Sequence, residues 1–265
     1  MSYETILTSV DDGILTITLN RPERLNAWTP QMGGELREAI TEGNDDESVT
    51  AMVVTGAGRG FCAGADIEEV FKAQADGNAP SRGSNSPGDW VGLIRSSKPM
   101  VGAINGPAIG VGLTQVLPMD YLVASKPAKL SLRFVKMGLV PELASSHFVN
   151  LRVGFGNTSE LMLTGKTILA EEALEIGLVD RVTEPDGLLP AAHEIAKSMG
   201  ENPQEALRMI KSLITRNTSE SDLAAVQQRE LEALKQCYVS PEHTEAIAAF
   251  LEKREPDFKA ARSGS

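Results

Sequence analysis

The sequence predicts an α/β fold in which parallel strands alternate with helices. Three short apolar runs, Ala51–Val54, Lys98–Ile104 and Tyr121–Ala124, have the composition of buried strands. Segments with apolar residues at helical spacing lie between and after them. The chain has 265 residues, 42% of them hydrophobic, which is enough for one large core. Because parallel strands need crossover connections, strands alternating with helices predict several parallel strands in one sheet.

The N-terminal part begins with a predicted β-hairpin. The β-rich runs Ile6–Val10 and Ile14–Leu19 flank Asp11-Asp12-Gly13, which is a strong turn signal. Pro30 to about Glu42 has the pattern of a helix. Two further short helices are expected, from about Asp66 to Ala73 and over Gly110–Leu117.

The rest of the chain is predicted to contain a long loop and a mostly helical second part. Residues 74–89 are rich in Gly, Pro, Ser and Asn, and a loop of that length is usually mobile or functional. From about Ala144 the pattern is mostly helical, and we predict a core of residues 1–200 followed by a helical C-terminal region of residues 201–265. The helices expected there are Ala170–Ile176, Pro203–Arg216, Ser221–Cys237 and Pro241–Lys253.

Charge, cysteine and histidine content argue against several classes of function. Asp and Glu number 36 against 25 Lys and Arg, a net charge of −11, so no nucleic-acid partner is expected. Cys62, Cys237 and the three histidines show no metal-ligand spacing, so neither a metal nor a disulfide is predicted. The N-terminus lacks a secretory pattern, and no run of about 18 apolar residues occurs. A cytoplasmic protein without a membrane partner is therefore expected.

A glycine-rich turn joins a predicted strand to a predicted helix within residues 54–66. Gly56, Gly58 and Gly60 allow the backbone to turn sharply and to approach a ligand closely. The helix that follows begins near Ala65, and the first N–H groups of a helix have no partner within it. Such N–H groups suit the negative charge that develops on a carbonyl oxygen.

Residues 99–113 repeat this arrangement. An apolar strand enters a turn, and a helix begins with Gly110-Val111-Gly112, whose first N–H groups are again free. Two strand ends on one sheet can direct their donors at a single oxygen. Together the two segments predict a site that polarises a carbonyl.

Four phrases of the sequence together resemble the enoyl-CoA hydratase/isomerase (crotonase) superfamily, in the family's order and spacing. They are Asn20–Ala27 (NRPERLNA), Gly60–Asp66 (GFCAGAD), Lys98–Gly106 (KPMVGAING) and Leu163–Asp180 (LTGKTILAEEALEIGLVD). The resemblance, which runs from about residue 3 to 258, implies a spiral ββα core with a C-terminal helical region. It also implies an acyl-CoA thioester as ligand and a homotrimer or homohexamer. No separate cofactor is implied, because coenzyme A is part of the substrate.

The same resemblance implies roles for particular residues. The oxyanion donors correspond to the N–H groups of Ala65 and Val111, although many relatives have Gly at the second position. Arg24 corresponds to a phosphate contact, and Phe250 and Lys253 to a C-terminal element that often reaches CoA, sometimes from a neighbouring subunit. A solvated charge at a helix end is the alternative for Lys253. The expected substrate-binding residues are Arg24, Ala63, Gly64, Asp66, Ile67, Gly110, Phe250 and Lys253.

The positions of the acidic residues indicate which reaction the site performs. Hydratases of this family use two glutamates, and the corresponding positions here are Thr114 and Phe134, neither of which can activate water as a carboxylate does. Glu142, in the phrase Gly138–Ser146, instead resembles the single acid of the Δ3,Δ2-enoyl-CoA isomerases of fatty acid metabolism. We therefore expect an isomerase that moves a 3-enoyl double bond to the 2-position through a dienolate, with Glu142 carrying the proton.

Several alternatives remain open on the sequence alone. Pro141-Glu142 also has the pattern of a helix start, in which an acid favours the helix dipole. Another crotonase reaction, such as ring-opening isomerisation or hydration, could use the same carboxylate, and a non-catalytic acyl-CoA-binding relative would lack the acids. Trp28 and Trp90 either line an acyl tunnel or pack in the core.

Overall fold

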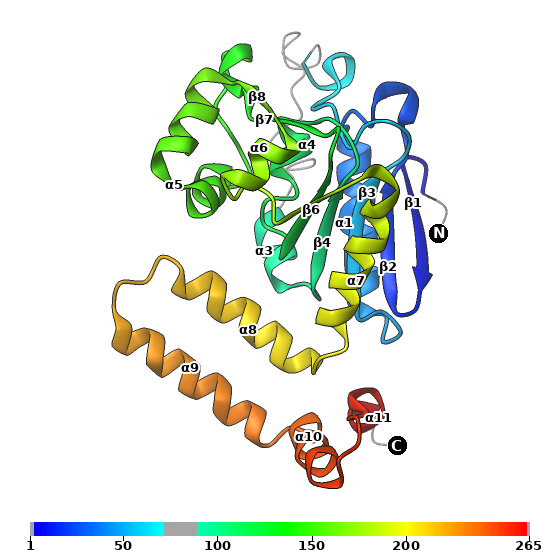
Figure 1. The fold of residues 1–265 in the computed structure, drawn as a ribbon, viewed down its shortest axis with the longest axis vertical. Coiled ribbons are helices and arrows are strands. Elements are labelled where there is room, and N and C mark those ends of the chain that lie inside the picture. The colour runs from blue at the N-terminus through cyan, green and yellow to red at the C-terminus, as the bar shows by residue number, and fades with distance from the viewer. Residues whose placement is uncertain (1–2, 72–88, 264–265) are drawn as a thin grey trace. The chain divides into compact units, whose positions relative to one another are not determined.

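The computed structural model describes residues 3–71 and 89–263 (Figure 1). The chain forms two compact units, Met1–Lys197 and Ser198–Ser265, each described by itself below. The predicted division after residue 200 lies three residues beyond this boundary, at the end of helix α7 (Leu188–Gly200). The loop predicted at residues 74–89 lies, except for Asp89, outside the described residues.

A six-stranded sheet forms the centre of the first unit. Its strand order is β1-β2-β3-β4-β6-β9, and every pairing except the β1–β2 hairpin is parallel, which confirms the predicted α/β class. The strands are β1 (Ile6–Asp11), β2 (Ile14–Leu19), β3 (Ala51–Gly56), β4 (Met100–Ile104), β6 (Tyr121–Ser125) and β9 (Arg181–Thr183).

Both faces of the middle of this sheet are buried, because alternate residues of each strand enter different cores. In β3, Met52 and Val54 belong to the larger core, which also contains buried residues of α1. Ala51 and Val53 belong to a smaller core that includes four residues of α7. Helix α7 accordingly lies against the sheet in Figure 1. Strands buried on both faces read as the continuous apolar runs from which they were predicted.

A second, three-stranded sheet was not predicted. It pairs β5 (Ala108–Ile109) with β7 (Lys129–Ser131) in parallel and β7 with β8 (Thr167–Leu169) antiparallel. Strands of two or three residues are too short to show a periodicity in the sequence. This small sheet matters for the site, because the N–H of Gly110 donates to the Ser131 carbonyl at 2.9 Å and thereby orients the turn before Val111.

The helices follow the predicted positions, with two corrections. The helix expected over Gly110–Leu117 is only the single turn α4 (Val111–Thr114), and the one expected from Asp66 is a π-helical turn, η2 (Ile67–Phe71), as far as the described residues extend. Within residues 3–71 and 89–263, every helix falls short of the length and apolarity needed to cross a bilayer. The other helices of the first unit are η1 (Pro22–Arg24), α1 (Pro30–Asp45), α3 (Trp90–Ser96), η3 (Arg133–Met137), α5 (Ser145–Thr164), α6 (Ala170–Glu175) and η4 (Pro185–Gly187).

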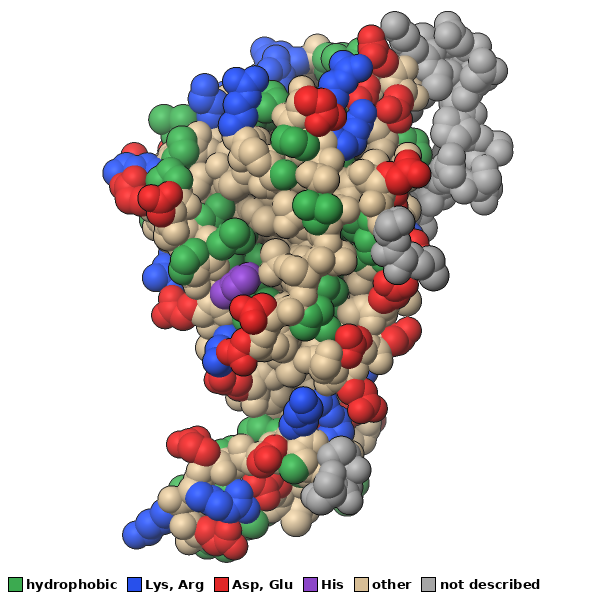
Figure 2. All heavy atoms as spheres, turned by 90° about the vertical axis from the view of Figure 1, so that its right-hand side faces the viewer, with side chains coloured by type: hydrophobic (Ala, Val, Ile, Leu, Met, Phe, Trp, Pro, Cys, Tyr) green, Lys and Arg blue, Asp and Glu red, His purple; other side chains and the backbone are tan. Residues whose placement is uncertain are grey.

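The C-terminal unit is helical, as predicted. It contains α8 (Gln204–Asn217), α9 (Leu223–Tyr238), α10 (Pro241–Glu252) and α11 (Phe258–Ser263). Asp222 and Ser240 cap α9 and α10 through their side chains, as Asp and Ser do at helix starts. On the face shown in Figure 2, acidic and basic side chains are interspersed, as the composition suggests.

The two glycine-rich segments are joined directly through their backbones. The N–H groups of Phe61 and Cys62 donate to the Pro107 carbonyl at 3.1 and 2.9 Å, and the Ile109 N–H donates to the Cys62 carbonyl at 3.0 Å. Gly112 permits this approach, because a Cβ there would lie 2.2 Å from the Cys62 carbonyl oxygen. The residue next to the expected donor Val111 must therefore be a glycine.

We predict that Gly112→Ala destabilises the protein by about 1–3 kcal/mol, the usual cost of forcing an atom into a packed site. Gly156→Ala is the matched control, since a Cβ at Gly156 meets no heavy atom within 4 Å. Denaturant unfolding of both variants measures the difference. Equal denaturant midpoints for the two variants would show that the two glycine-rich segments can move apart to accommodate the added methyl group.

Candidate active site

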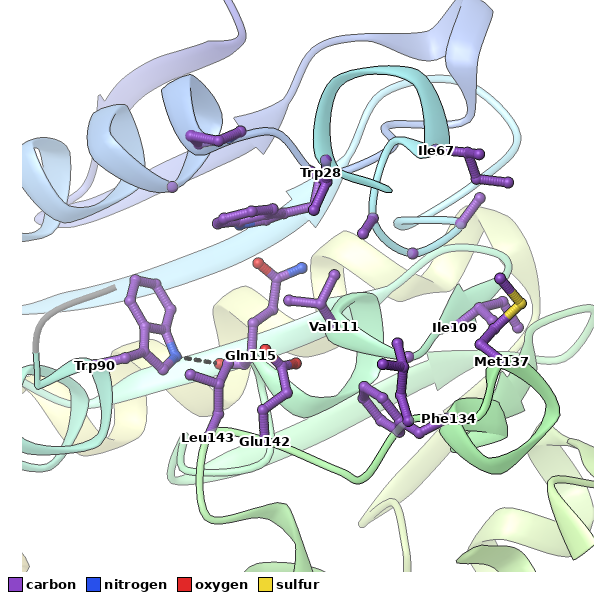
Figure 3. A pocket seen from close by; sticks show the side chains of 18 of the residues that line it. Trp28, Ile67, Trp90, Ile109, Val111, Gln115, Phe134, Met137, Glu142 and Leu143 are labelled. Atoms are coloured by element: carbon purple, nitrogen blue, oxygen red, sulfur yellow. Dashed lines mark hydrogen bonds between the residues drawn. The ribbon is translucent and has the colours of Figure 1, made fainter. Parts of the chain in front are cut away.

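A cavity of about 860 Å³ lies where the two glycine-rich segments meet (Figure 3). Its walls come from one face of α1, the segments around Ala65 and Val111, the start of α3, and the stretch from η3 to Leu143. Figure 3 shows Trp28 and Trp90 towards one end of the cavity and Ile67 and Met137 towards the other. The lining residues are Trp28, Pro30, Gly33, Gly34, Arg37, Ala63, Gly64, Ala65, Ile67, Val70, Trp90, Ile109, Gly110, Val111, Gln115, Arg133, Phe134, Met137, Leu139, Val140, Glu142 and Leu143.

Both expected oxyanion donors line this cavity. Within the described parts of the chain, neither the Ala65 N–H nor the Val111 N–H donates a backbone hydrogen bond. Each follows a glycine with a positive φ, Gly64 at 106° and Gly110 at 54°, a region that side chains rarely adopt. Val111 itself has no positive φ, so the absence of glycine at this position leaves the backbone donor intact.

Glu142 reaches the same cavity because the chain before α5 does not form a helix. Leu143 and Ala144 both have left-handed backbones, with φ of 52° and 53°, and α5 begins only at Ser145. The alternative in which Pro141-Glu142 starts a helix is therefore wrong. Two consecutive left-handed residues are costly for non-glycine side chains, and such strain is often found at functional sites. Figure 3 shows the carboxylate pointing into the cavity between Leu143 and Phe134.

A hydroxyl group holds the Glu142 carboxylate. The Thr114 Oγ1, from the fully buried side chain of Thr114, donates to the Glu142 Oε1 at 2.9 Å. The carboxylate is accessible from the cavity, but the protein around it displaces much of its hydration and raises its pKa, while the Thr114 hydrogen bond acts in the opposite direction. Phe134 and Leu143 both line the cavity and supply apolar surface beside the carboxylate.

Comparison with known proteins identifies the family. The sequence model of the enoyl-CoA hydratase/isomerase family matches residues 9–261. The chain belongs to this family. A 1,2-epoxyphenylacetyl-CoA isomerase of Escherichia coli is 33% identical over 96% of this chain and 98% of its own. A probable enoyl-CoA hydratase of Mycobacterium leprae is 36% identical over 97% and 99% of the two chains.

Solved structures of the family confirm the crotonase fold. The crystal structure of an enoyl-CoA hydratase from Polaromonas sp. JS666 superposes with a TM-score of 0.86, at 28% identity, over 95% of this chain and 98% of that one. An enoyl-CoA hydratase from Bacillus anthracis gives a TM-score of 0.84 at 29% identity, over 97% and 99% of the chains. Relatives named as hydratases and as isomerases both occur, so family membership leaves the reaction to be argued from the site.

The substrate-binding residues expected for a member of this family fall into three groups. Ala63, Gly64, Ile67 and Gly110 line the cavity. Asp66 and Arg24 are not among the lining residues. Phe250 and Lys253 lie in the C-terminal unit, where Phe250 is 82% exposed and Lys253 ends α10 with a φ of 55°. Their expected contact with CoA, like the expected homotrimer or homohexamer, stays a prediction.

Asp66 and Arg24 organise the turn beside the cavity. The buried Asp66 carboxylate pairs with Arg21 at 3.1 Å and accepts hydrogen bonds from the N–H groups of Glu68 and Glu69. Burial raises the pKa of Asp66, but these hydrogen bonds and the Arg21 guanidinium outweigh it and hold the pKa below its ordinary value. Arg24, which is half exposed, pairs with Glu68 at 3.0 Å. Arg24 is thus close to the segment expected to hold CoA, and its own phosphate contact stays a prediction.

Four functional candidates were missed or left open on the sequence. The sequence showed Thr114 only as a position where hydratases have a glutamate. Its contact with Glu142 could not be predicted, because it joins residues 28 positions apart. Gln115, which is 3% exposed, also lines the cavity and had no distinguishing sequence signal. Trp28 and Trp90 line the cavity, and the Trp90 Nε1 donates to the Gln115 carbonyl at 2.9 Å. Among the described residues, no cluster of three or more His, Cys, Asp and Glu side chains is placed to hold a metal.

We predict that Thr114→Val raises the pKa of Glu142 further, because the variant removes the Thr114 hydrogen bond, which favours the carboxylate. Nuclear magnetic resonance of protein labelled with ¹³C at the glutamate carboxyls measures that pKa directly. Thr114→Ser keeps the hydroxyl and is expected to titrate like the wild type. Identical titrations of the valine and serine variants would mean that the contact does not form in solution.

Proposed function

We propose that this protein is an enoyl-CoA isomerase that converts a 3-enoyl-CoA into the conjugated 2-enoyl-CoA. One observation carries the proposal: among the described residues that line the cavity, Glu142 is the single carboxylate, and the same cavity holds the free N–H groups of Ala65 and Val111. An isomerisation of this kind needs one group that both removes and returns a proton, together with donors for the thioester oxygen.

The reaction follows from these groups. The thioester oxygen accepts hydrogen bonds from the N–H groups of Ala65 and Val111. The Glu142 carboxylate takes a proton from C2, and the electron pair of the broken C–H bond moves into the conjugated system, with the negative charge on the thioester oxygen. Protonated Glu142 then returns the proton to C4, which leaves the double bond between C2 and C3. Preorganised donors stabilise the charge of this dienolate where it develops.

The surroundings of Glu142 suit this cycle. A carboxylate of ordinary pKa is a weak base towards a carbon acid, and a raised pKa brings it closer to the working pH. The protein around the cavity displaces water from Glu142 and so raises its pKa, and Phe134 and Leu143 supply apolar surface there. Conversely, hydration needs a held water and a second acid. At the two hydratase positions this chain instead has Thr114, whose hydroxyl donates a hydrogen bond to Glu142, and Phe134, whose phenyl ring cannot transfer a proton.

Isomerisation of a strained ring next to a thioester is the second candidate. The observation that favours it is the 33% identity, over 96% of this chain, with the 1,2-epoxyphenylacetyl-CoA isomerase of Escherichia coli. The two tryptophans that line the cavity offer flat apolar surfaces to an aromatic acyl group. Both candidates share the oxyanion donors and differ in the acyl group.

We predict that Glu142→Gln lowers the rate of 3-enoyl-CoA isomerisation by about 10²- to 10⁴-fold, because the amide cannot carry the proton. The appearance of the conjugated thioester, followed by its ultraviolet absorbance, measures the rate. Glu38→Gln, on an exposed position of α1, is the control and should retain activity. Near-wild-type conversion by Glu142→Gln would rule out this carboxylate as the proton carrier.

The product mass distinguishes the competing reactions. Wild-type enzyme is expected to convert a 3-enoyl-CoA into a product of unchanged mass, whereas hydration of a 2-enoyl-CoA adds the mass of one water. Turnover of 1,2-epoxyphenylacetyl-CoA but not of a 3-enoyl-CoA would favour the second candidate. Binding of all these thioesters without turnover would indicate a non-catalytic relative.

A further inference from the structure

Helix α1 turns one face towards the cavity, and two of the four residues on that face are glycines without a side chain. The lining residues Pro30, Gly33, Gly34 and Arg37 follow the spacing of a single helix face. A Cβ at Gly33 would lie 2.6 Å from a ring carbon of Trp28, so the indole lies directly against the helix. A Cβ at Gly34 would meet no heavy atom within 4 Å. The cavity therefore extends along α1 as far as Arg37.

Arg37 is the last residue of α1 that lines the cavity, and no acidic side chain among the described residues neutralises its charge. Its side chain is half-buried, and no ion pair or hydrogen bond of its guanidinium is formed with the described residues. The positions one turn away on α1 are Gly33, Gly34, Ile40 and Thr41, none of which carries a charge.

Other partly buried arginines of the chain behave differently. Arg21 pairs with Asp66, Arg95 with Asp120 and Arg152 with Asp180, each at 2.9 to 3.1 Å. Acidic residues outnumber basic ones, 36 to 25, so partners for an arginine are abundant in this protein. An uncompensated guanidinium in a cavity wall is therefore a candidate ligand group.

Arg37 lies along α1, away from the backbone pairing of Trp28 with the expected donor Ala65. Residues 63–67 include the expected donor Ala65, and Figure 3 shows Ile67 and Trp90 at opposite sides of Glu142. Trp28 pairs with Ala65 through its backbone, while its indole contacts Gly33. From Pro30 beside this pairing, α1 carries Arg37 away by seven residues, about 10 Å along the helix axis.

We propose that the acyl group bound in this cavity ends in a carboxylate, which pairs with the Arg37 guanidinium. This inference rests on the proposed function, because it takes the thioester to be held at Ala65 and Val111. The substrate class is then the mono-CoA thioester of an unsaturated dicarboxylic acid. Such an acyl group would place its thioester at the oxyanion donors and its far end at α1.

The physical case is one of desolvation. A ligand that fills the cavity removes water from the Arg37 guanidinium, and a methyl-ended chain offers nothing in its place. A carboxylate offers two oxygens that match the planar fork of the guanidinium. Gln115, whose side chain points towards Trp28 in Figure 3, adds a polar amide to the cavity wall, and this amide also donates to the Gly112 carbonyl at 3.4 Å.

Calorimetry with two saturated thioesters of equal chain length tests the proposal without requiring turnover. Adipyl-CoA is expected to bind about tenfold or more tightly than hexanoyl-CoA, the usual effect of a charged hydrogen-bonded pair. Arg37→Met keeps the length of the side chain and should abolish this preference, because adipyl-CoA loses its partner while hexanoyl-CoA, which no longer desolvates a guanidinium, binds at least as tightly as before. Arg133→Met, at the other arginine of the cavity wall, should retain the preference.

Three outcomes would overturn the assignment. Equal binding of the two thioesters by the wild type would exclude the ion pair. If Arg37→Met weakened the binding of adipyl-CoA and hexanoyl-CoA equally, with an unchanged melting temperature, Arg37 would contact the CoA part of the ligand and not the end of the acyl chain. Loss of the preference in Arg133→Met instead would assign it to that residue. Failure to bind either thioester would count against the proposed function itself, whereas binding without preference overturns only the role of Arg37.

Discussion

The backbone pairing between residues 61–62 and 107–109 is the constraint on which the site depends. It joins the chain that leaves β3 to the chain that leaves β4, and these neighbouring parallel strands deliver both to one edge of the sheet. Glycine at 106 and 112 makes the contact possible, because a Cβ at either would lie 2.2 Å from a carbonyl oxygen of the other segment. The proposed donors are thus fixed by main-chain atoms and need no reorganisation when charge develops.

The carboxylate is held by a different kind of device. Two left-handed residues, Leu143 and Ala144, delay the start of α5 and leave Glu142 free to enter the cavity. This placement opposes stability. A carboxyl whose pKa is raised by folding binds its proton more tightly in the folded state than in the unfolded state. Its contribution to stability is therefore fully present below the ordinary pKa and is lost as the pH rises through the raised pKa. Glu142 therefore destabilises the fold under the conditions in which it would act as a base.

Much of the fold could be predicted because the large sheet has clear local signals. The Asp12-Gly13 turn separates two β-rich runs, and the strands buried on both faces are continuous apolar segments. The small sheet β5-β7-β8 and the shortness of α4 could not be predicted, since they depend on pairings between distant segments. The site followed the same pattern: the glycine-rich turns indicated the two segments and the family resemblance assigned the donors to Ala65 and Val111, whereas Gln115 and Arg37 acquire meaning only from the cavity they line.

By itself, the sequence determined the α/β class, the family resemblance and the vacant hydratase positions at Thr114 and Phe134, and it predicted the positions of the two backbone donors. These are local features, and each is carried by residue type and spacing along the chain. Only the tertiary structure decided between the two interpretations of Glu142, as a helix-start acid or as a side chain of the cavity. The decision depended on the backbone angles of Leu143 and Ala144 and on a hydrogen bond from Thr114, 28 residues away. A sequence pattern cannot report such a contact, because it is made by packing and not by neighbours in the chain.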